Sequence, residues 1–157
     1  MARQEIVLTA EGLKKVTAEI DELKSVGRPR VADRIREAKQ FGDIAENAEY
    51  EAAKAEQSLI EGRIDALQSI LQNAVISEGP GKDGRVSVGS VVRLREVTSG
   101  EETEYHIVGA LEADPAKNRI SNQSPIGEAL IGKKAEKTVK VRTPGGVRTY
   151  VILAVGE

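Results

Sequence analysis

The chain has 157 residues, a formal net charge of −2, no cysteine and one histidine, His106. This composition excludes disulfides, thiolate metal sites and the usual nitrogen-ligand sites for zinc or iron, so any bound metal must be held by oxygen. Neither half of the chain carries a strong basic excess, which argues against a dedicated DNA-binding protein and leaves room only for a weak contact with DNA.

The sequence also lacks the marks of a membrane or exported protein. No apolar run approaches the roughly 18 residues that a membrane span requires. The N-terminus has no apolar stretch of the kind found in signal peptides. We therefore expect a cytoplasmic protein with no membrane partner.

The first half of the chain has the apolar spacing of helices that pack on one another. A heptad stripe predicts a helix from about residue 10, and Thr9 is its expected N-cap. Gly27 and Pro29 predict a kink in this helix, because proline has no amide hydrogen and restricts the residue before it. The pattern then resumes until Gly42, and Asp43 is the expected N-cap of a second helix. The first stripe consists of Leu13, Val16, Ile20 and Leu23.

A second stripe predicts the returning helix, which gives an antiparallel hairpin. Its members are Ile60, Ile64, Leu67, Leu71 and Ala74. An outgoing arm over residues 10–40 would be about 45 Å long at 1.5 Å per residue, more than a small core needs. This length suggests that the arm serves to extend away from the rest of the protein. A coiled-coil spacer or dimerisation arm is the alternative interpretation.

After residue 76 the pattern changes to the alternation of strands. A glycine-rich linker at 77–84 precedes a small sheet domain at 85–157, so the arm is 1–76. A short helix is expected after Ser124 as N-cap and Pro125 at the first helical position. Residues 143–146 should form a hairpin turn. The expected strands are 85–97, 104–110, 138–142 and 147–155.

Two acidic residues at the expected tip of the hairpin form a candidate metal site. Asp43 and Glu46 are three residues apart, so on one helical turn their oxygens could meet at one cation such as Mg²⁺. The alternative is that they only interact with the positive end of the helix dipole. Two carboxylates are too few for a nuclease site, so any catalytic site here must be completed by another protein.

Several ordered motifs along the chain resemble one family. Residues 37–39, 42–50 and 52–54 read EAK, GDIAENAEY and AAK. They are followed by EGRI, SPI, LIGK and TPGG, which begin at residues 61, 124, 130 and 143. This combination resembles the bacterial GreA-type transcript cleavage factors over nearly the whole chain.

The resemblance implies an α+β fold, with an antiparallel coiled-coil arm followed by an FKBP-like sheet domain. It further implies that the arm enters the secondary channel of bacterial RNA polymerase and stimulates cleavage of backtracked nascent RNA. Asp43 and Glu46 would help to hold a second, weakly bound Mg²⁺ in the polymerase active site and position the attacking water. The chain would then not be an enzyme itself.

Two further groups of residues are candidates for contacts with the partner. By resemblance, the first group, which surrounds the expected short helix after Ser124, docks on the rim of the polymerase channel. Helix capping by Ser124 and core packing by Ile126 are the alternative explanation for these residues. The second is a basic run over residues 24–39, in which Arg34 and Lys39 are expected near the RNA 3′ end. Ion pairs on a solvated helix face are the alternative for this run. The docking group is Asn122, Ser124, Pro125 and Ile126.

Two other functions fit the same architecture. They are a related inhibitor of the polymerase and a structural coiled-coil adaptor. Related inhibitory factors have a differently acidic tip, and an adaptor needs no paired acids. The intact pattern of residues 42–50 therefore favours transcript cleavage.

Overall fold

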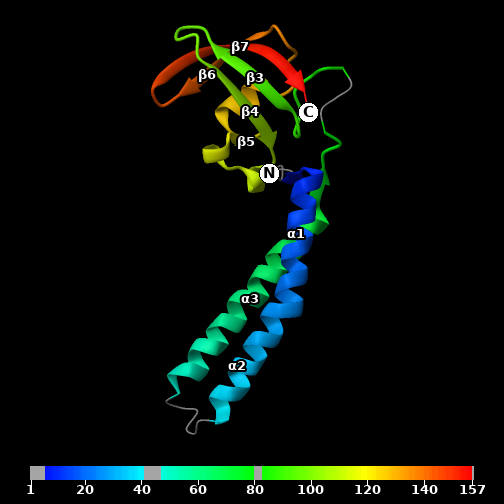
Figure 1. Cartoon of the computed structure of the whole chain (residues 1–157), viewed down its shortest axis with the longest axis vertical. Coiled ribbons are helices and arrows are strands. Elements are labelled where there is room, and N and C mark those ends of the chain that lie inside the picture. Colours follow the sequence, from blue (N-terminus) through cyan, green and yellow to red (C-terminus); the bar gives the residue numbers. More distant parts are fainter. Residues whose placement is uncertain (1–5, 41–46, 80–82, 157) are drawn as a thin grey trace, which may run out of the picture. The chain divides into compact units, whose positions relative to one another are not determined.

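The computed structural model describes residues 6–40, 47–79 and 83–156, which belong to two compact units (Figure 1). The helical unit is Lys14–Asn73. The sheet unit combines Met1–Leu13 with Ala74–Glu157, so the first turn of the first helix belongs to the sheet unit.

The outgoing limb of the arm is helical along its described length. It consists of α1 (Ala10–Glu22), the π-helical turn η1 (Leu23–Gly27) and α2 (Arg28–Gln40). In η1 the backbone N–H of Arg28 donates to the carbonyl of Leu23, five residues earlier. Pro29 follows directly and cannot donate a backbone hydrogen bond, and a local π turn is one way in which a helix accommodates such a break. Where the sequence predicts a kink, the structure has this π turn.

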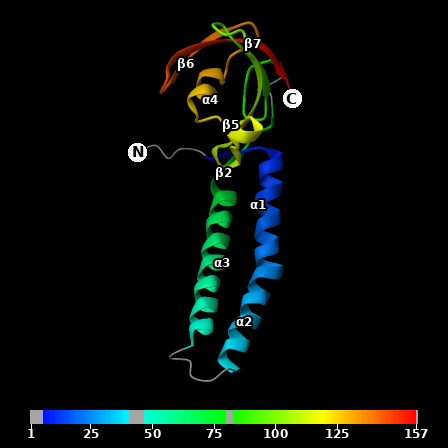
Figure 2. The same cartoon turned by 60° about the vertical axis from the view of Figure 1, so that its left-hand side comes forward.

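The returning limb is one helix, α3 (Ala48–Asn73), which runs beside α2 (Figures 1 and 2). Val31, Ile60 and Ile64 form a buried cluster between the limbs, and Leu23 and Ile35 pack against it. Leu23, Ile60 and Ile64 belong to the predicted stripes, and Val31 and Ile35 lie where the pattern was expected to resume after Pro29. The apolar stripe therefore stabilises the hairpin as the sequence predicts.

The sheet unit is built on a five-stranded sheet with the order β5-β4-β3-β7-β6. All neighbouring strands are antiparallel except β4 and β5, which are parallel. The hairpin between β6 and β7 turns at Thr143 and Gly146, as predicted. The strands are β3 (Val91–Glu96), β4 (Glu102–Val108), β5 (Arg119–Ser121), β6 (Thr138–Thr143) and β7 (Gly146–Gly156).

The short helix α4 (Pro125–Leu130) lies on the concave side of this curved sheet (Figure 2). Leu130 from α4 is fully buried in the core of the unit. The other core residues come mainly from alternate positions of the strands, and they include Val92, Leu94, Ile107, Val139, Val141, Tyr150 and Ile152. The predicted α+β fold, with a helical hairpin and a small sheet domain carrying one short helix, is confirmed.

Three details differ from the sequence prediction. The strand predicted from residue 85 begins only at Val91, because Gly89 adopts a φ of +102° in a turn that ends the extended backbone. The short strand β5 was not predicted. Nor was a second, two-stranded parallel sheet of β1 (Ile6–Leu8) and β2 (Ala74–Ile76), whose residue Leu8 is fully buried.

Candidate functional site

The tip acids Asp43 and Glu46 lie outside the described residues, but the structure defines the helix ends on either side of them. α2 ends at Gln40 and α3 begins at Ala48. Asn47 caps α3, since its Oδ1 accepts a hydrogen bond of 3.2 Å from the backbone N–H of Tyr50. The described start of α3 is thus capped by Asn47, and the predicted cap Asp43 lies outside the described residues.

Asn47 also connects the two limbs of the arm. Its Nδ2 donates a hydrogen bond of 2.6 Å to the backbone carbonyl of Ala38, near the end of α2. Ala38 and Ala53 are both buried, and small buried residues allow two helices to approach closely. Asn47 was not among the predicted caps, although asparagine is among the strongest N-cap residues and it stands directly before the helical pattern of α3.

The basic run faces a row of glutamates on α3. Arg28 donates two hydrogen bonds to Glu61, of 2.7 and 2.8 Å. Arg34 contacts Glu56 over 2.6 Å and Glu49 over 3.4 Å. The hydrogen bonds that Arg34 donates to Glu56 and, to a smaller extent, to Glu49 raise the pKa of Arg34, and the hydrogen bond donated by Arg28 lowers the pKa of Glu61.

These ion pairs bear on the predicted RNA contact. Arg34 is engaged by two acids of the arm itself, which is the alternative that the sequence left open. Lys39 lies exposed in the last turn of α2, close to the tip. Of the two predicted residues, Lys39 is therefore the better placed to meet a phosphate, and the RNA role of both stays a prediction.

The predicted docking group surrounds the start of α4. The Oγ of Ser124 accepts a hydrogen bond of 3.1 Å from the N–H of Gly127 and donates one of 2.7 Å to the carbonyl of Ser121. Ile126 packs against the core, whereas Pro125 is exposed. The predicted cap is confirmed, and the docking role of this group stays a prediction.

Asn122 differs from its neighbours in this group. Its backbone N–H donates to the carbonyl of Val108 over 3.0 Å. Its side-chain Oδ1 is buried and has no hydrogen-bond partner among the described residues. Asn122 therefore has an unused acceptor beside the exposed Pro125.

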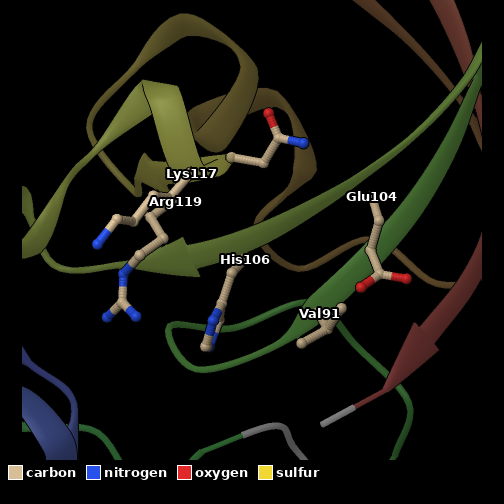
Figure 3. Close-up of a pocket in the computed structure, with 6 residues that line it drawn as sticks. Val91, Glu104, His106, Lys117 and Arg119 are labelled. Carbon is tan, nitrogen blue, oxygen red and sulfur yellow. The ribbon is translucent and has the colours of Figure 1, made fainter.

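A hollow of about 390 Å³ lies at the edge of the sheet where β4 and β5 meet (Figure 3). His106 and Arg119 are register partners on these strands, and their side chains extend to the same side of it. The guanidinium of Arg119 lies 3.8 Å from Glu11 and 3.9 Å from Glu112, so its charge is already balanced. The remaining lining residues are Val91, Glu104, Lys117 and Asn118.

The hollow has few groups that could act in catalysis. Among the described residues that line it, Glu104 is the one acid and His106 the one imidazole. Within residues 6–40, 47–79 and 83–156, no three His, Asp or Glu side chains come together in a way that could hold a metal ion. Nor does the described part of the chain contain a helix that is long and apolar enough to cross a membrane.

Comparisons with known proteins agree with the motifs at the tip. Residues 6–76 match the family model for the N-terminal domain of transcription elongation factors, and residues 81–157 match the model for the C-terminal domain of GreA/GreB. The transcription elongation factor GreA of Caldanaerobacter subterraneus subsp. tengcongensis is 50% identical over 151 residues, which cover 96% of each chain. The GreA of Acetivibrio thermocellus is 50% identical over 153 residues, 97% of this chain and 96% of the relative.

A solved structure adds one further similarity. The crystal structure of GreA factor homolog 1 from Thermus thermophilus is 31% identical, with a TM-score of 0.43, and the match covers 98% of this chain and all of that chain. Both family models together span nearly all of the sequence. The chain belongs to the GreA/GreB family of transcription elongation factors.

Proposed function

We propose that this elongation factor inserts the tip of its arm into the secondary channel of bacterial RNA polymerase and stimulates endonucleolytic cleavage of backtracked nascent RNA. Arrested elongation complexes are thereby rescued, in the cytoplasm. The observation that carries the proposal is the two-helix arm, whose limbs are joined by a segment that contains Asp43 and Glu46. A hydrogen bond from Asn47 to Ala38 ties the limbs together beside this segment.

The chemistry of the two tip residues fits Mg²⁺. Carboxylate oxygens are hard ligands, and Mg²⁺ commonly takes only one or two of them from a protein and completes its octahedron with water and phosphate oxygens. In phosphodiester cleavage the ion supplies charge neutralisation and orients the reacting oxygens. Asp43 and Glu46 would hold this ion beside the one that the polymerase keeps, and they would position the attacking water.

In this proposal the chain is not an enzyme by itself. Two carboxylates supply fewer ligands than phosphodiester chemistry needs, so the polymerase contributes the rest of the site. The chain's part is to bring charge to the correct position, which is the main contribution proteins make to phosphoryl transfer. Without polymerase, the protein should leave RNA intact.

Other residues of the chain have supporting roles. Lys39, and Arg34 to a smaller extent, lie on the limb that leads to the tip and would contact phosphates near the RNA 3′ end. The group of Asn122, Ser124, Pro125 and Ile126 would dock on the rim of the channel. The exposed Pro125 supports this docking surface.

A cleavage assay tests the proposal. Purified protein is added to stalled, backtracked elongation complexes with Mg²⁺, and the labelled transcripts are separated by length. The wild type should shorten the transcripts, whereas Asp43→Asn and Glu46→Gln should bind polymerase normally and lose stimulated cleavage on the order of 100-fold. The matched control is Glu51→Gln, which neutralises an exposed acid in the first turn of α3 and should retain activity.

The same assay separates the two alternatives. An inhibitor would slow elongation and leave the backtracked RNA uncut. A structural adaptor would do neither, whatever residues stand at positions 43 and 46. Full cleavage by both tip variants would defeat the assignment of these two acids.

A further inference from the structure

A carboxylate from a residue distant in the sequence caps the first turn of the arm. Glu112 lies in the 3-10 turn η3 (Ala110–Glu112) of the sheet unit. Its Oε2 accepts a hydrogen bond of 2.9 Å from the backbone N–H of Thr9, and its Oε1 accepts one from the Thr9 hydroxyl. Thr9 Oγ1 in turn accepts from the N–H of Gly12 over 3.0 Å. Residues 103 positions apart thus share one helix cap.

This arrangement is a capping box whose acidic member comes from elsewhere in the chain. In an ordinary capping box, the residue three positions after the cap is Glu or Gln, and its side chain returns to the N–H of the cap residue. Here that position is Gly12. A Cβ atom on Gly12 would lie 2.4 Å from the carboxyl carbon of Glu112, so the glycine leaves the space that the distant carboxylate fills.

The carboxylate is held from the side of the sheet as well. Its side chain is only 7% exposed, and Arg119 Nη2 lies 3.9 Å from its Oε1. The backbone N–H of Glu112 donates to the carbonyl of Gly109 over 2.9 Å, which fixes the turn that carries it. We call the group of Thr9, Gly12, Glu112 and Arg119 the trans-cap.

We propose that Glu112 is a positioning residue for the tip, acting through the trans-cap on the first turn of α1. The inference rests on the proposed function, because it assigns to the trans-cap a role in presenting Asp43 and Glu46. A cap supplied from within the helix would stabilise the helix end equally well. A cap supplied by the sheet unit stabilises the helix end and also attaches it to that unit.

The length of the arm makes this attachment matter. Residues 10–40 are helical throughout, and at 1.5 Å per residue they span about 45 Å. A tilt of about 3° at the first turn would therefore move the far end by about 2 Å. A displacement of about 1 Å at a reacting centre can cost on the order of 100-fold in rate. A small change in the tilt of the helix at Thr9 would thus cause a large displacement at the tip.

Moving the carboxylate along the chain separates attachment from capping. Glu112→Ala removes both functions. The double variant Glu112→Ala with Gly12→Glu restores an ordinary capping box inside α1, but the hydrogen bonds from Thr9 to Glu112 of the sheet unit are then lost. Gly12→Ala favours the helix locally, because alanine is the better helix former, and at the same time takes the space of the Glu112 carboxylate. Glu78→Gln, at an exposed glutamate of the same unit, is the matched control.

Each full-length variant is titrated into backtracked polymerase complexes, and the maximal cleavage rate and the half-saturating concentration are measured. We expect Glu112→Ala, the double variant and Gly12→Ala to lower the maximal rate about 10-fold to 100-fold with the half-saturating concentration unchanged. The double variant should regain the thermal stability that Glu112→Ala loses. Recovery of the full cleavage rate by the double variant would reduce Glu112 to a simple cap and overturn the proposal, as would full activity of Gly12→Ala.

A second measurement keeps this inference separate from the proposed function. Amide hydrogen exchange over residues 6–20 of the free protein should be faster in Glu112→Ala than in the wild type and in Glu78→Gln. Unchanged exchange would contradict the trans-cap without reference to polymerase. Failure of the wild type to stimulate cleavage would instead contradict the proposed function.

Discussion

The side-chain amide of Asn47 donates a hydrogen bond of 2.6 Å to the backbone carbonyl of Ala38. The two residues lie on opposite limbs of the arm, on either side of the segment that carries Asp43 and Glu46. The same side chain caps α3 through Tyr50. One carboxamide thus uses its donor on one limb and its acceptor on the other.

Substitutions of Asn47 separate these two contacts. Asn47→Ala loses both and should lower the free energy of unfolding by about 1–2 kcal/mol. Asn47→Asp keeps an acceptor for Tyr50 and gains from the helix dipole, but it cannot donate to Ala38. We expect it to be closer to wild-type in stability and as defective as Asn47→Ala in stimulated cleavage. Urea denaturation and the cleavage assay check both values, and wild-type cleavage by Asn47→Asp would show that the bond to Ala38 is dispensable.

Two glycines should respond in opposite directions to the same substitution. A Cβ atom on Gly109 would lie 1.8 Å from the carbonyl oxygen of Val7 in β1, so Gly109→Ala must displace backbone and should destabilise the protein by about 1–3 kcal/mol. Gly62 is in the interior of α3 with nothing within 4 Å of the added atom. Gly62→Ala should therefore stabilise it by about 0.5–1 kcal/mol. Chemical denaturation of both variants measures the difference, and an equal effect would be inconsistent with the close approach of β1.

A charge exchange tests what Arg34 does. Arg34→Glu would face Glu56 and Glu49 and should lower the melting temperature, whereas adding Glu56→Arg should recover part of the loss. The recovery is only partial because Arg30 also loses its partner Glu56. The melting temperatures of the two single variants and the pair give the coupling. Additive losses would mean that the ion pair contributes nothing.

A variant of the exposed Lys39 tests whether the basic run contacts RNA, in comparison with the Arg34 variants. Lys39→Glu should leave the melting temperature unchanged and weaken crosslinking to the RNA 3′ end in the backtracked complex. The Arg34 and Glu56 exchange should affect crosslinking less. Unchanged crosslinking after reversal of both Arg34 and Lys39 would exclude the basic run as an RNA contact.

The ionisation of Tyr105 should be visible at alkaline pH. Burial raises the pKa of Tyr105, and the neighbouring Tyr150 and Glu101 raise it further. A raised pKa in the folded state means that its contribution to stability is complete below the pKa of an unfolded tyrosine, about 10, and is lost as the pH rises through the folded value. The difference between the tyrosinate absorbance titrations of wild type and Tyr105→Phe should therefore show a transition above that of free tyrosine. A transition at the ordinary pH would contradict the burial effect.

The arm could be predicted from the sequence because its signals are local and repeated. The stripes through Ile20 and Ile64 predicted two helices, and Thr9 and Ser124 were recognised as caps from their side chains alone. The spacing of the tip acids indicated a candidate metal site, but only the resemblance favoured it over a capping role, since acidic residues beside a helix start have a common electrostatic explanation.

The features that the sequence did not reveal depend on distant partners. Strands β1 and β2 are three residues each, too short for a periodic signal, and they pair only because the chain returns to the same place after the arm. Glu112 is an ordinary surface-type residue until the fold places it against Gly12. The π turn before Pro29 accommodates the backbone hydrogen bond that proline cannot donate. The sequence predicted a kink at this point but not its form.

The Mg²⁺ dependence of cleavage tests the central claim most directly, because the claim is that the tip adds ligands for a weakly held ion. Cleavage rates of backtracked complexes are measured over a range of Mg²⁺ concentrations with wild type, Asp43→Asn, Glu46→Gln and Glu51→Gln. The wild type and Glu51→Gln should shift half-maximal cleavage to a lower Mg²⁺ concentration than polymerase alone requires, and the two tip variants should not. The same shift with Asp43→Asn and Glu46→Gln as with the wild type would show that these carboxylates do not hold the ion.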